Sequence, residues 1–225
     1  MRRSGARVAG FVLAVACGLM LLAGMIDALG SSAPLMRALM TRFAPPASTG
    51  LPSGEYDGMT TMITRYLSGA VDECQYTWTD ESGVTYLAFQ AHEQQHMADC
   101  RALFVLDREV LLFSAMATAA LLGACWALRD RRRAAQGFLA GSGALLAVAL
   151  GLILWGVIDF DGLFILFHQL SFDNGLWLLD PATDLLIRLM PTRFFVTYAA
   201  ILGGSWLGGM LLAMLLGWRV MKIRR

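Results

Sequence analysis

Charged residues are scarce in this chain: Lys, Arg, Asp and Glu make up 16% of its 225 residues, against roughly 25% in soluble globular proteins. Hydrophobic residues make up 57%. This composition excludes an ordinary soluble domain. The apolar residues also gather in long uncharged runs at Val8–Ile26, Val110–Leu128, Ala134–Ile158 and Phe194–Trp218. Each run is close to the roughly 20 residues that a helix needs to cross the hydrocarbon of a membrane.

The fold class expected from these runs is an all-α membrane protein with a four-transmembrane-helix bundle. Its extracytoplasmic loops are expected to contain short interfacial helices and a β-hairpin. We expect one integral membrane domain over residues 1–225, with helices at about 8–29, 105–128, 135–158 and 194–218 and outer loops at 30–104 and 159–193.

Lys and Arg are unevenly distributed. Of the 18 cations, 11 fall in residues 2–7, 129–133 and 219–225, where Asp130 alone of the 17 acids opposes them. The positive-inside rule places such short basic segments in the cytoplasm. Both termini are therefore expected in the cytoplasm and both long loops outside. Because the basic clusters are explained as topology signals, no nucleic-acid partner is expected.

The first apolar run admits another interpretation. Residues Met1–Arg7, followed by Val8–Ala16 and Cys17, are similar to a signal peptide with a loose lipobox. A cleavable core is typically about 7 to 15 residues, whereas the apolar run here continues to Ile26. We therefore expect a retained helix.

The first outer loop contains three patterned segments. A short helix is expected near Pro34–Phe43, and apolar residues at helical spacing predict an amphipathic helix from Asp57, its N-cap, to Gly69. Two β-rich segments, Tyr76–Thr79 and Val84–Leu87, flank a turn cluster and predict a hairpin.

A polar helix is expected to begin near Ala91 and lead into the second span. If it ran straight, His96 would lie about 14 residues, or roughly 20 Å, above Val110. Chemistry on lipids could not take place there. We therefore expect a bend at Asp99–Leu103; the alternative is that Asp107–Glu109 sinks into the headgroup layer as a local ion pair.

The second outer loop is unusually apolar. Phe160–Phe167 and Leu185–Met190 are too short to cross and are expected to lie in the membrane interface. Asp180 as N-cap, Pro181 at the first helical position and Pro191 as the stop delimit the second of these helices.

Histidine is rare, and all three histidines fall in the outer loops. His92-Glu93-Gln94-Gln95-His96 matches H-E-x-x-H, in which two imidazoles on one helix face bind zinc and the glutamate activates water. His168 could be a third ligand. This pattern predicts a membrane zinc metalloprotease, unless the motif is a solvated polar helix with an incidental histidine.

A second polar group surrounds His168. It lies among Phe and Leu residues, close in sequence to Asp173, Asn174, Trp177, Asp180 and Asp184. A histidine at the hydrocarbon edge is costly unless it is paired, which favours a functional role over a single interfacial hydrogen bond. The chain lacks a G-x-S-x-G elbow and a phosphate-binding glycine loop, which removes the basis for a serine hydrolase or a nucleotide-binding protein.

Cysteine is also rare. Cys74 and Cys100 lie in the first outer loop, and Cys17 and Cys125 lie in or beside spans. In an oxidising compartment the first pair could form a disulfide worth roughly 3 to 4 kcal/mol. Two free thiols are the alternative.

Five segments of the two outer loops form one longer pattern: Glu93-x-x-His96-Met97-x-Asp99, Phe167-His168, Phe172-x-Asn174-x-x-Trp177-x-x-Asp180-Pro181-x-x-Asp184-x-Leu186-Ile187, Pro191 and Tyr66-Leu67-Ser68-Gly69. Together they resemble the bacterial lipoprotein intramolecular transacylase (Lit) family. The resemblance covers most of the chain and includes the four-span layout.

The resemblance implies an acyltransferase of the bacterial cell membrane with its active site on the extracytoplasmic face. Such an enzyme moves the sn-2 acyl chain of a diacylglyceryl lipoprotein to the α-amine of its N-terminal cysteine, giving the lyso-form. The implied partners are that lipoprotein and membrane lipid. A monomer is expected, without a cofactor or metal.

By match to the family motif, the two functional histidines are His96 and His168. One imidazole would take a proton from the attacking amine while the other donates to the oxyanion or the departing alkoxide. Which histidine does which remains open. Glu93, Asp99 and Asn174 would fix the tautomers, while Trp177 and Asp180 would support the site. The rival interpretations are the zinc protease and a non-enzymatic membrane assembly factor.

Overall fold

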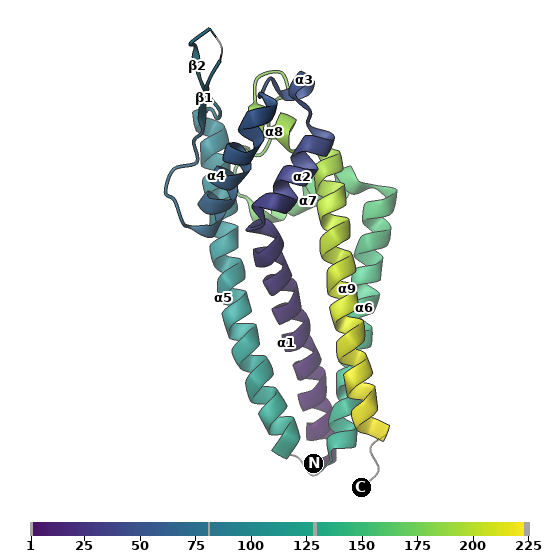
Figure 1. Cartoon of the computed structure of the whole chain (residues 1–225). Helices are drawn as coiled ribbons and strands as arrows, with labels where there is room; N and C mark the ends of the chain where they lie inside the picture. The colour runs from purple at the N-terminus through teal and green to yellow at the C-terminus, as the bar shows by residue number, and fades with distance from the viewer. Residues whose placement is uncertain (1, 81, 128–129, 223–225) are drawn as a thin grey trace. The chain divides into compact units, whose positions relative to one another are not determined.

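The structure is a computed structural model that describes residues 2–80, 82–127 and 130–222. Its elements, in chain order (Figure 1), are α1 (Arg2–Gly30), α2 (Ala33–Phe43), α3 (Pro46–Thr49), η1 (Ser53–Glu55), α4 (Tyr56–Ser68), β1 (Thr77–Thr79), β2 (Thr85–Leu87), α5 (Ala91–Ala127), α6 (Arg131–Ile158), α7 (Phe160–Ser171), α8 (Leu185–Leu189) and α9 (Thr192–Lys222). The predicted fold class is confirmed: the described residues are largely helical and contain four membrane-length helices and one small hairpin.

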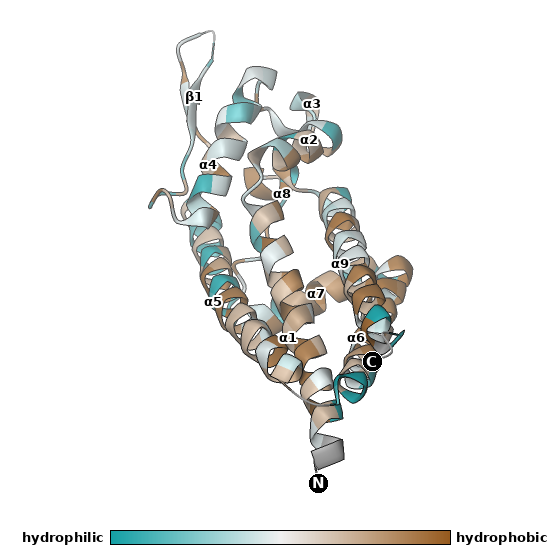
Figure 2. Cartoon of the chain, turned by 60° about the horizontal axis from the view of Figure 1, so that its bottom comes forward, coloured by the Kyte–Doolittle hydropathy of each residue, from teal (hydrophilic) through white to brown (hydrophobic). Residues whose placement is uncertain are grey.

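In the part of the chain that the structure describes, four helices are long and apolar enough to cross a membrane: Gly5–Gly30, Ala91–Ala127, Arg131–Ile158 and Thr192–Val220. Apolar residues cover most of their length (Figure 2). Large side chains such as Phe113, Val148 and Trp126 are more than 60% exposed on their surfaces. Exposed apolar side chains on these helices are the expected surface for contact with lipid tails.

The chain divides into two compact units. The first unit comprises residues 1–26, 107–158 and 201–225, and the second comprises residues 27–106 and 159–200. The division falls within α1, α5 and α9, which each contribute residues to both units.

The first unit is a bundle formed by α1, α5, α6 and α9. Glycines bring α1 and α6 into backbone contact: a Cβ on Gly10 would lie 1.9 Å from the Ala134 carbonyl oxygen, and one on Gly137 would lie 1.9 Å from that of Arg7. The indole of Trp206 on α9 donates a 2.8 Å hydrogen bond to the carbonyl of Gly18 on α1. Small residues that allow such close approach are typical of membrane helix interfaces.

The second unit has its own apolar core. It contains, among others, Met36, Leu39 and Met40 of α2, Tyr56, Met59 and Ile63 of α4, Met97 of α5 and Leu185, Leu186 and Leu189 of α8. Helix α4 confirms the predicted amphipathic helix, and it ends at Gly69 with φ 81°, a left-handed conformation that glycine adopts without strain. Its N-cap is Glu55, and Asp57 lies in its first turn instead.

The predicted hairpin is also present. Trp78 of β1 faces Tyr86 of β2, and their rings stack 5.4 Å apart. Asp80 closes the turn because its carboxylate accepts hydrogen bonds from the amides of Ser82 and Val84.

Two local expectations were wrong. Helix α5 continues without a break through Asp99–Leu103, which leaves the alternative as the prediction: Asp107–Glu109 sinks into the headgroup layer and brings His96 closer to the lipids. Helix α8 begins at Leu185 with Asp184 as its N-cap, four residues later than expected. Residues 181–183 form turns instead, because the Asp184 carboxylate accepts the Asp180 amide and the Thr183 hydroxyl.

Candidate active site

The start of α5 is fixed by Glu93, which is fully buried. Its Oε2 accepts the amide of Gln90, three residues earlier, at 2.8 Å, which is half of a capping box. Its Oε1 accepts the amide of Leu186, in the first turn of α8, at 2.7 Å. One carboxylate thereby accepts hydrogen bonds from amides at the starts of two helices, which have no partner within their own helix. It joins segments that are 93 residues apart.

Asp184 makes a second connection between the same segments. Its Oδ2 lies 3.0 Å from Nε2 of His92 and accepts the Asp180 amide at 2.8 Å. Burial alone would raise the pKa of Asp184, but hydrogen bonds from His92, the Asp180 amide and Thr183 outweigh burial and hold the pKa below its ordinary value. His92 and Asp180 thus belong to the attachment of α8 to α5.

A third connection holds the segment that follows α7. The side-chain amide of Asn174 donates to Asp99 of α5 at 2.9 Å, and its oxygen accepts the Leu176 amide at 3.0 Å. This bond fixes the turn between Phe172 and Trp177 against α5.

His168 lies on α7 within a group of aromatic rings. The nearest are Phe164 at 4.1 Å, Trp177 at 5.0 Å, Phe167 at 5.3 Å and Phe172 at 5.5 Å, measured between ring centroids. The side chain is 7% exposed. Burial lowers the pKa of His168 below its ordinary value, and the hydrogen bond to the Phe164 carbonyl opposes this only in part.

The tautomer of His168 follows from one contact. Nδ1 lies 2.7 Å from the carbonyl oxygen of Phe164, one turn earlier on α7. A carbonyl oxygen can only accept, so Nδ1 carries the hydrogen and the neutral ring has its lone pair on Nε2. Nε2 is therefore the basic atom of this imidazole.

His96 lies on α5 facing the same group. Its ring centroid is 6.1 Å from that of His168 and 5.2 Å from that of Phe172. Nε2 lies 3.7 Å from the sulfur of Cys100, while the buried Nδ1 has no hydrogen-bond partner. A buried nitrogen without a partner is costly and is typical of sites that bind another molecule.

The structure thus brings His96, His168 and Trp177 together in the second unit. Glu93, Asp99 and Asn174 lie in the same region, but their hydrogen bonds hold backbone segments and each other. For His168 the expectation that they fix the tautomer was wrong, because the Phe164 carbonyl fixes it.

Two contributors were missing from the sequence-based site. Phe164 and Phe172 both contact His168, and Phe172 also contacts His96. The i, i+4 spacing of Phe164 and His168 on one helix face could have indicated the first. Nothing in the local pattern indicates that a backbone carbonyl would orient the imidazole.

The H-E-x-x-H segment does not have the arrangement of a zinc centre. Among the residues that the structure describes, no group of three or more His, Cys, Asp or Glu side chains is placed to hold a metal ion. Glu93 would have to release the amides of Gln90 and Leu186 before it could activate water, and His92 contacts Asp184.

The four cysteines are all free, so the disulfide considered between Cys74 and Cys100 is not formed. Burial, followed by the nearby charge of Glu93, raises the pKa of Cys74 to about 12. A thiol with so high a pKa is unreactive at neutral pH.

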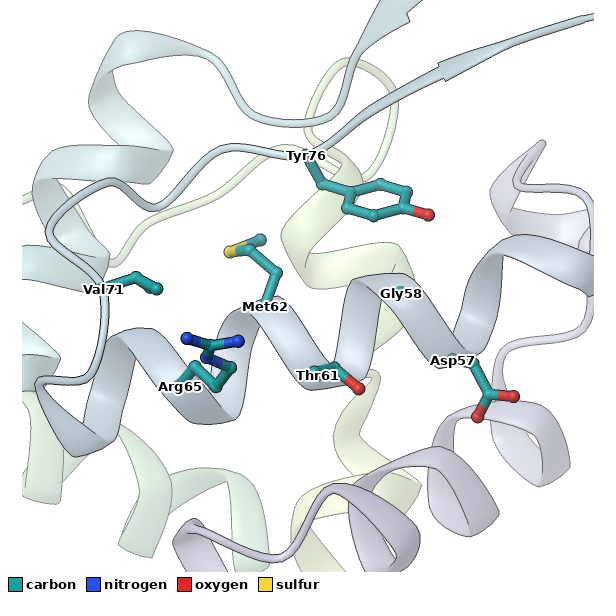
Figure 3. Close-up of a pocket in the computed structure, with 7 residues that line it drawn as sticks. All are labelled: Asp57, Gly58, Thr61, Met62, Arg65, Val71 and Tyr76. Atoms are coloured by element: carbon teal, nitrogen blue, oxygen red, sulfur yellow. The ribbon is translucent and has the colours of Figure 1, made fainter.

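A separate groove lies between α4 and the segment leading to β1 (Figure 3). It has a volume of roughly 410 Å³ and is lined by Asp57, Gly58, Thr61, Met62, Arg65, Val71 and Tyr76. None of its residues belongs to the histidine group.

The fold and the site together define an integral membrane protein with paired imidazoles in an aromatic enclosure. Residues 11–195 match the family model described as lipoprotein intramolecular transacylase Lit. This match covers most of the chain, so the chain belongs to the Lit family of membrane acyltransferases. No curated protein matches the chain.

Solved structures share the fold. The membrane-integral lipoprotein intramolecular transacylase Lit of Bacillus cereus superposes with a TM-score of 0.78 at 22% identity, covering 97% of each chain. Two variants of that protein, in which one histidine is replaced by arginine or by alanine, give TM-scores of 0.73 at 21% identity. They cover 97% of this chain and 93% or 94% of theirs.

Proposed function

We propose that this chain moves the sn-2 acyl chain of a diacylglyceryl lipoprotein to the α-amine of the lipoprotein's N-terminal cysteine. The observation that supports this best is the pairing of His96 and His168 at a centroid distance of 6.1 Å inside an aromatic group. No hydrogen bond joins the two rings among the described contacts. Each ring therefore remains free to bond a reacting group between them.

The step is an ester aminolysis within one molecule. The α-amine attacks the sn-2 ester carbonyl, a C–N bond forms and the C–O bond to the glyceryl oxygen breaks. The proton lost by the amine ends on the glyceryl oxygen, which becomes a free hydroxyl. No water is consumed and no atom leaves, so the lyso-form product is an isomer of the substrate.

We assign His168 as the base, because Nδ1 is committed to the Phe164 carbonyl and Nε2 holds the lone pair. His96, whose pKa burial lowers to about 4, would be neutral and donate a hydrogen bond to the oxyanion, while His168 passes the amine proton on to the departing alkoxide. The buried Nδ1 of His96 has no partner in the structure, which leaves that atom available to the substrate. The aromatic rings would exclude water, which favours transfer to the amine over hydrolysis.

The exposed face of α7 supports access from the membrane. Phe167 and Leu170, one turn apart on α7, are 52% and 78% exposed, although His168 beside them is buried. We propose that α7 lies in the membrane interface with this face toward lipid tails. A lipid-anchored substrate would then reach His168 past the ring of Phe167, 5.3 Å away.

We further propose that both termini are cytoplasmic, that loops 30–104 and 159–193 are extracytoplasmic, and that the enzyme acts as a monomer in a single membrane domain. The basic segments support this orientation. A cysteine in place of the exposed Asp72 or Leu178, one in each loop, in a variant without the four native cysteines, should react with a membrane-impermeant thiol reagent in intact spheroplasts. Labelling only after lysis would refute the topology.

The decisive test of the activity must locate the acyl chain, because the transfer does not change the mass. A purified diacylglyceryl lipoprotein should be incubated with the enzyme in lipid nanodiscs. Tandem mass spectrometry of the N-terminal peptide should then find the acyl group on nitrogen, and the α-amine should stop reacting with an amine label. Release of free fatty acid, or an acyl chain that stays on the glyceryl group, would refute the proposal.

A zinc measurement separates the protease alternative. We expect well under one zinc per chain in the purified protein and activity that resists chelators. Zinc bound in a 1:1 ratio and lost together with activity would favour the H-E-x-x-H interpretation instead.

A further inference from the structure

A second hollow lies in the first unit, on the surface of the α1–α6 pair. It has a volume of roughly 380 Å³ and is lined by Arg7, Val8, Phe11, Gln136, Gly137 and Ala140. All six residues belong to the first unit, whereas both histidines of the candidate active site belong to the second. The groove therefore has no part in the proposed transacylation.

The floor of the groove exists because two backbones touch. Gly137 has no side chain, and a Cβ there would lie 1.9 Å from the carbonyl oxygen of Arg7. The walls are apolar and open: Val8 is 60% exposed and Phe11 is 42% exposed. On a helix in the apolar part of a membrane, such an opening is filled by lipid.

One end of the groove is polar. The guanidinium of Arg7 donates a 3.1 Å hydrogen bond to the side-chain oxygen of Gln136, which is neutral. Among the residues that the structure describes, no carboxylate forms an ion pair with Arg7. A guanidinium has five N–H donors in a planar fork that suits phosphate, so most of its donors remain available.

The surroundings of Arg7 increase the positive charge. Helix α6 begins at Arg131 and continues with Arg132 and Arg133, only three residues before Gln136. Asp130 is bonded to Arg133. The start of α1, the end of α5, the start of α6 and the end of α9 lie together at this end of the unit (Figure 1). Clustered cations beside a membrane helix attract anionic lipid.

The residues that line the groove change from polar to apolar along its length, as a phospholipid does from headgroup to acyl chain. Arg7 is the last cation before the uncharged run of α1, and Phe11 lies one turn further along it. On α6, Gln136 lies at the polar end and Ala140 lies one turn deeper. A phosphate and an acyl chain are separated in the same direction.

We propose that this groove binds an anionic glycerophospholipid of the surrounding membrane, with its phosphate on Arg7 and one acyl chain along Phe11 and Ala140. The site requires both the charge of Arg7 and the open space at Ala140. A zwitterionic phospholipid carries its own ammonium group next to the phosphate and gains less from the charge of Arg7.

Native mass spectrometry of the detergent-purified protein tests this. Phosphatidylglycerol and phosphatidylcholine with the same acyl chains are added as competing probes, and the lipid retained on the folded protein is counted. The wild-type protein should prefer phosphatidylglycerol by about tenfold, because the ammonium group of phosphatidylcholine opposes the charge-assisted contact between Arg7 and the phosphate. Equal retention of the two lipids would overturn the proposal.

Variants locate the site. Arg7→Gln should reduce the preference to near one, and Arg7→Lys should keep part of it. Arg131→Gln is the matched control, because Arg131 lies over Trp126 at 4.3 Å and does not line the groove. It should keep the preference. An equal loss in Arg131→Gln would show diffuse attraction by charge and would overturn the assignment.

A filling variant covers the case in which Arg7→Gln does not fold. Ala140 is exposed, so Ala140→Leu places a larger side chain in the groove without touching a charge. Retention of phosphatidylglycerol should fall several-fold while the thermal unfolding temperature stays near that of the wild type. Unchanged retention in this folded variant would contradict the proposed site.

Discussion

The contacts inside the first unit differ in kind from the contacts inside the second. In the first unit, glycines such as Gly10 and Gly137 let helix backbones touch, and Trp206 supplies one hydrogen bond between α9 and α1. In the second unit, the buried carboxylate of Glu93 accepts the backbone amide of Leu186, 93 residues away, and the buried carboxylate of Asp184 contacts the imidazole of His92 on α5. Replacing a glycine by a larger residue should therefore destabilise the first unit most. Removing a carboxylate oxygen that accepts a hydrogen bond should destabilise the second unit most.

The difference corresponds to what each unit has to do. Lipid tails are as apolar as the helices that they surround, so packing geometry has to hold a membrane bundle together. A site for proton transfer has to place polar groups within tenths of an ångström, which requires directional hydrogen bonds. The following predictions are ordered from the largest expected effect to the smallest.

The largest effect should come from the paired imidazoles of the second unit. His96→Ala and His168→Ala should each lower transacylation by about 10² to 10⁴-fold, the usual contribution of general acid–base catalysis. The double variant should be hardly slower, because residues that act as one unit are strongly non-additive. The acyl position in the lipoprotein N-terminal peptide, followed over time, gives the rates.

His92→Ala is the control for that series. The imidazole of His92 is 40% exposed and contacts Asp184 rather than the other two rings. Most activity should remain. Full activity in either the His96 or the His168 variant would refute the two-histidine mechanism, and an inactive but folded His92 variant would revive the metal interpretation.

The next effect should appear in the first unit. Gly10→Ala places a Cβ 1.9 Å from the Ala134 carbonyl oxygen, so α1 and α6 must separate. The expected loss is about 3 kcal/mol of unfolding free energy, measured by thermal unfolding in a fixed detergent. Gly143→Ala is the control, because a Cβ there has nothing within 4 Å. Equal behaviour of the two variants would contradict the close-contact explanation.

A smaller effect should follow from changing one atom in the second unit. Glu93→Gln keeps the shape but puts an NH₂ group opposite a backbone amide, so one of two hydrogen bonds is lost. We expect a loss of about 2 kcal/mol, with reduced transacylation because α5 carries His96. The exposed Glu73→Gln variant should change neither quantity. An unaffected Glu93→Gln variant would show that the link between α5 and α8 does not depend on this carboxylate.

The smallest effect concerns pH. The substrate amine has an ordinary pKa near 8, so the rate should fall with a slope of one as the pH drops below that value. Burial lowers the pKa of His168, so its neutral form persists below the ordinary histidine range. The slope of log rate against pH should reach two only well below about pH 6.5. A slope of two already at pH 6.5 would contradict a buried, neutral base.

The sequence alone predicted those features that depend on local pattern. The membrane-length helices follow from uncharged runs, the end of α4 from Gly69, and the hairpin from alternating Thr and aromatic residues around Asp80–Gly83. Motif resemblance selected His96 and His168 as candidates. Local pattern could not show that α5 continues through Asp99–Leu103, because nothing in its composition there requires or forbids a bend.

The errors share one physical cause. Glu93 was expected to orient a histidine, and Asp180 was expected to cap α8. In both cases a buried carboxylate has a partner far away in the sequence: Leu186 is 93 residues from Glu93, and Asp184, which also accepts the Asp180 amide, contacts His92. Buried carboxylates bond to whichever amides the tertiary structure brings near them, and spacing along the chain does not reveal those partners.

The bond between Glu93 and Leu186 also has a consequence for biogenesis. A chain is synthesised from its N-terminus, so Glu93 emerges long before Leu186, and a carboxylate buried without a partner is costly. The start of α5 therefore cannot reach its final structure until α8, which contains Leu186, has been synthesised. An incompletely synthesised chain would hold His96 on an unanchored helix end, which keeps a partly inserted enzyme from acting on the lipids around it.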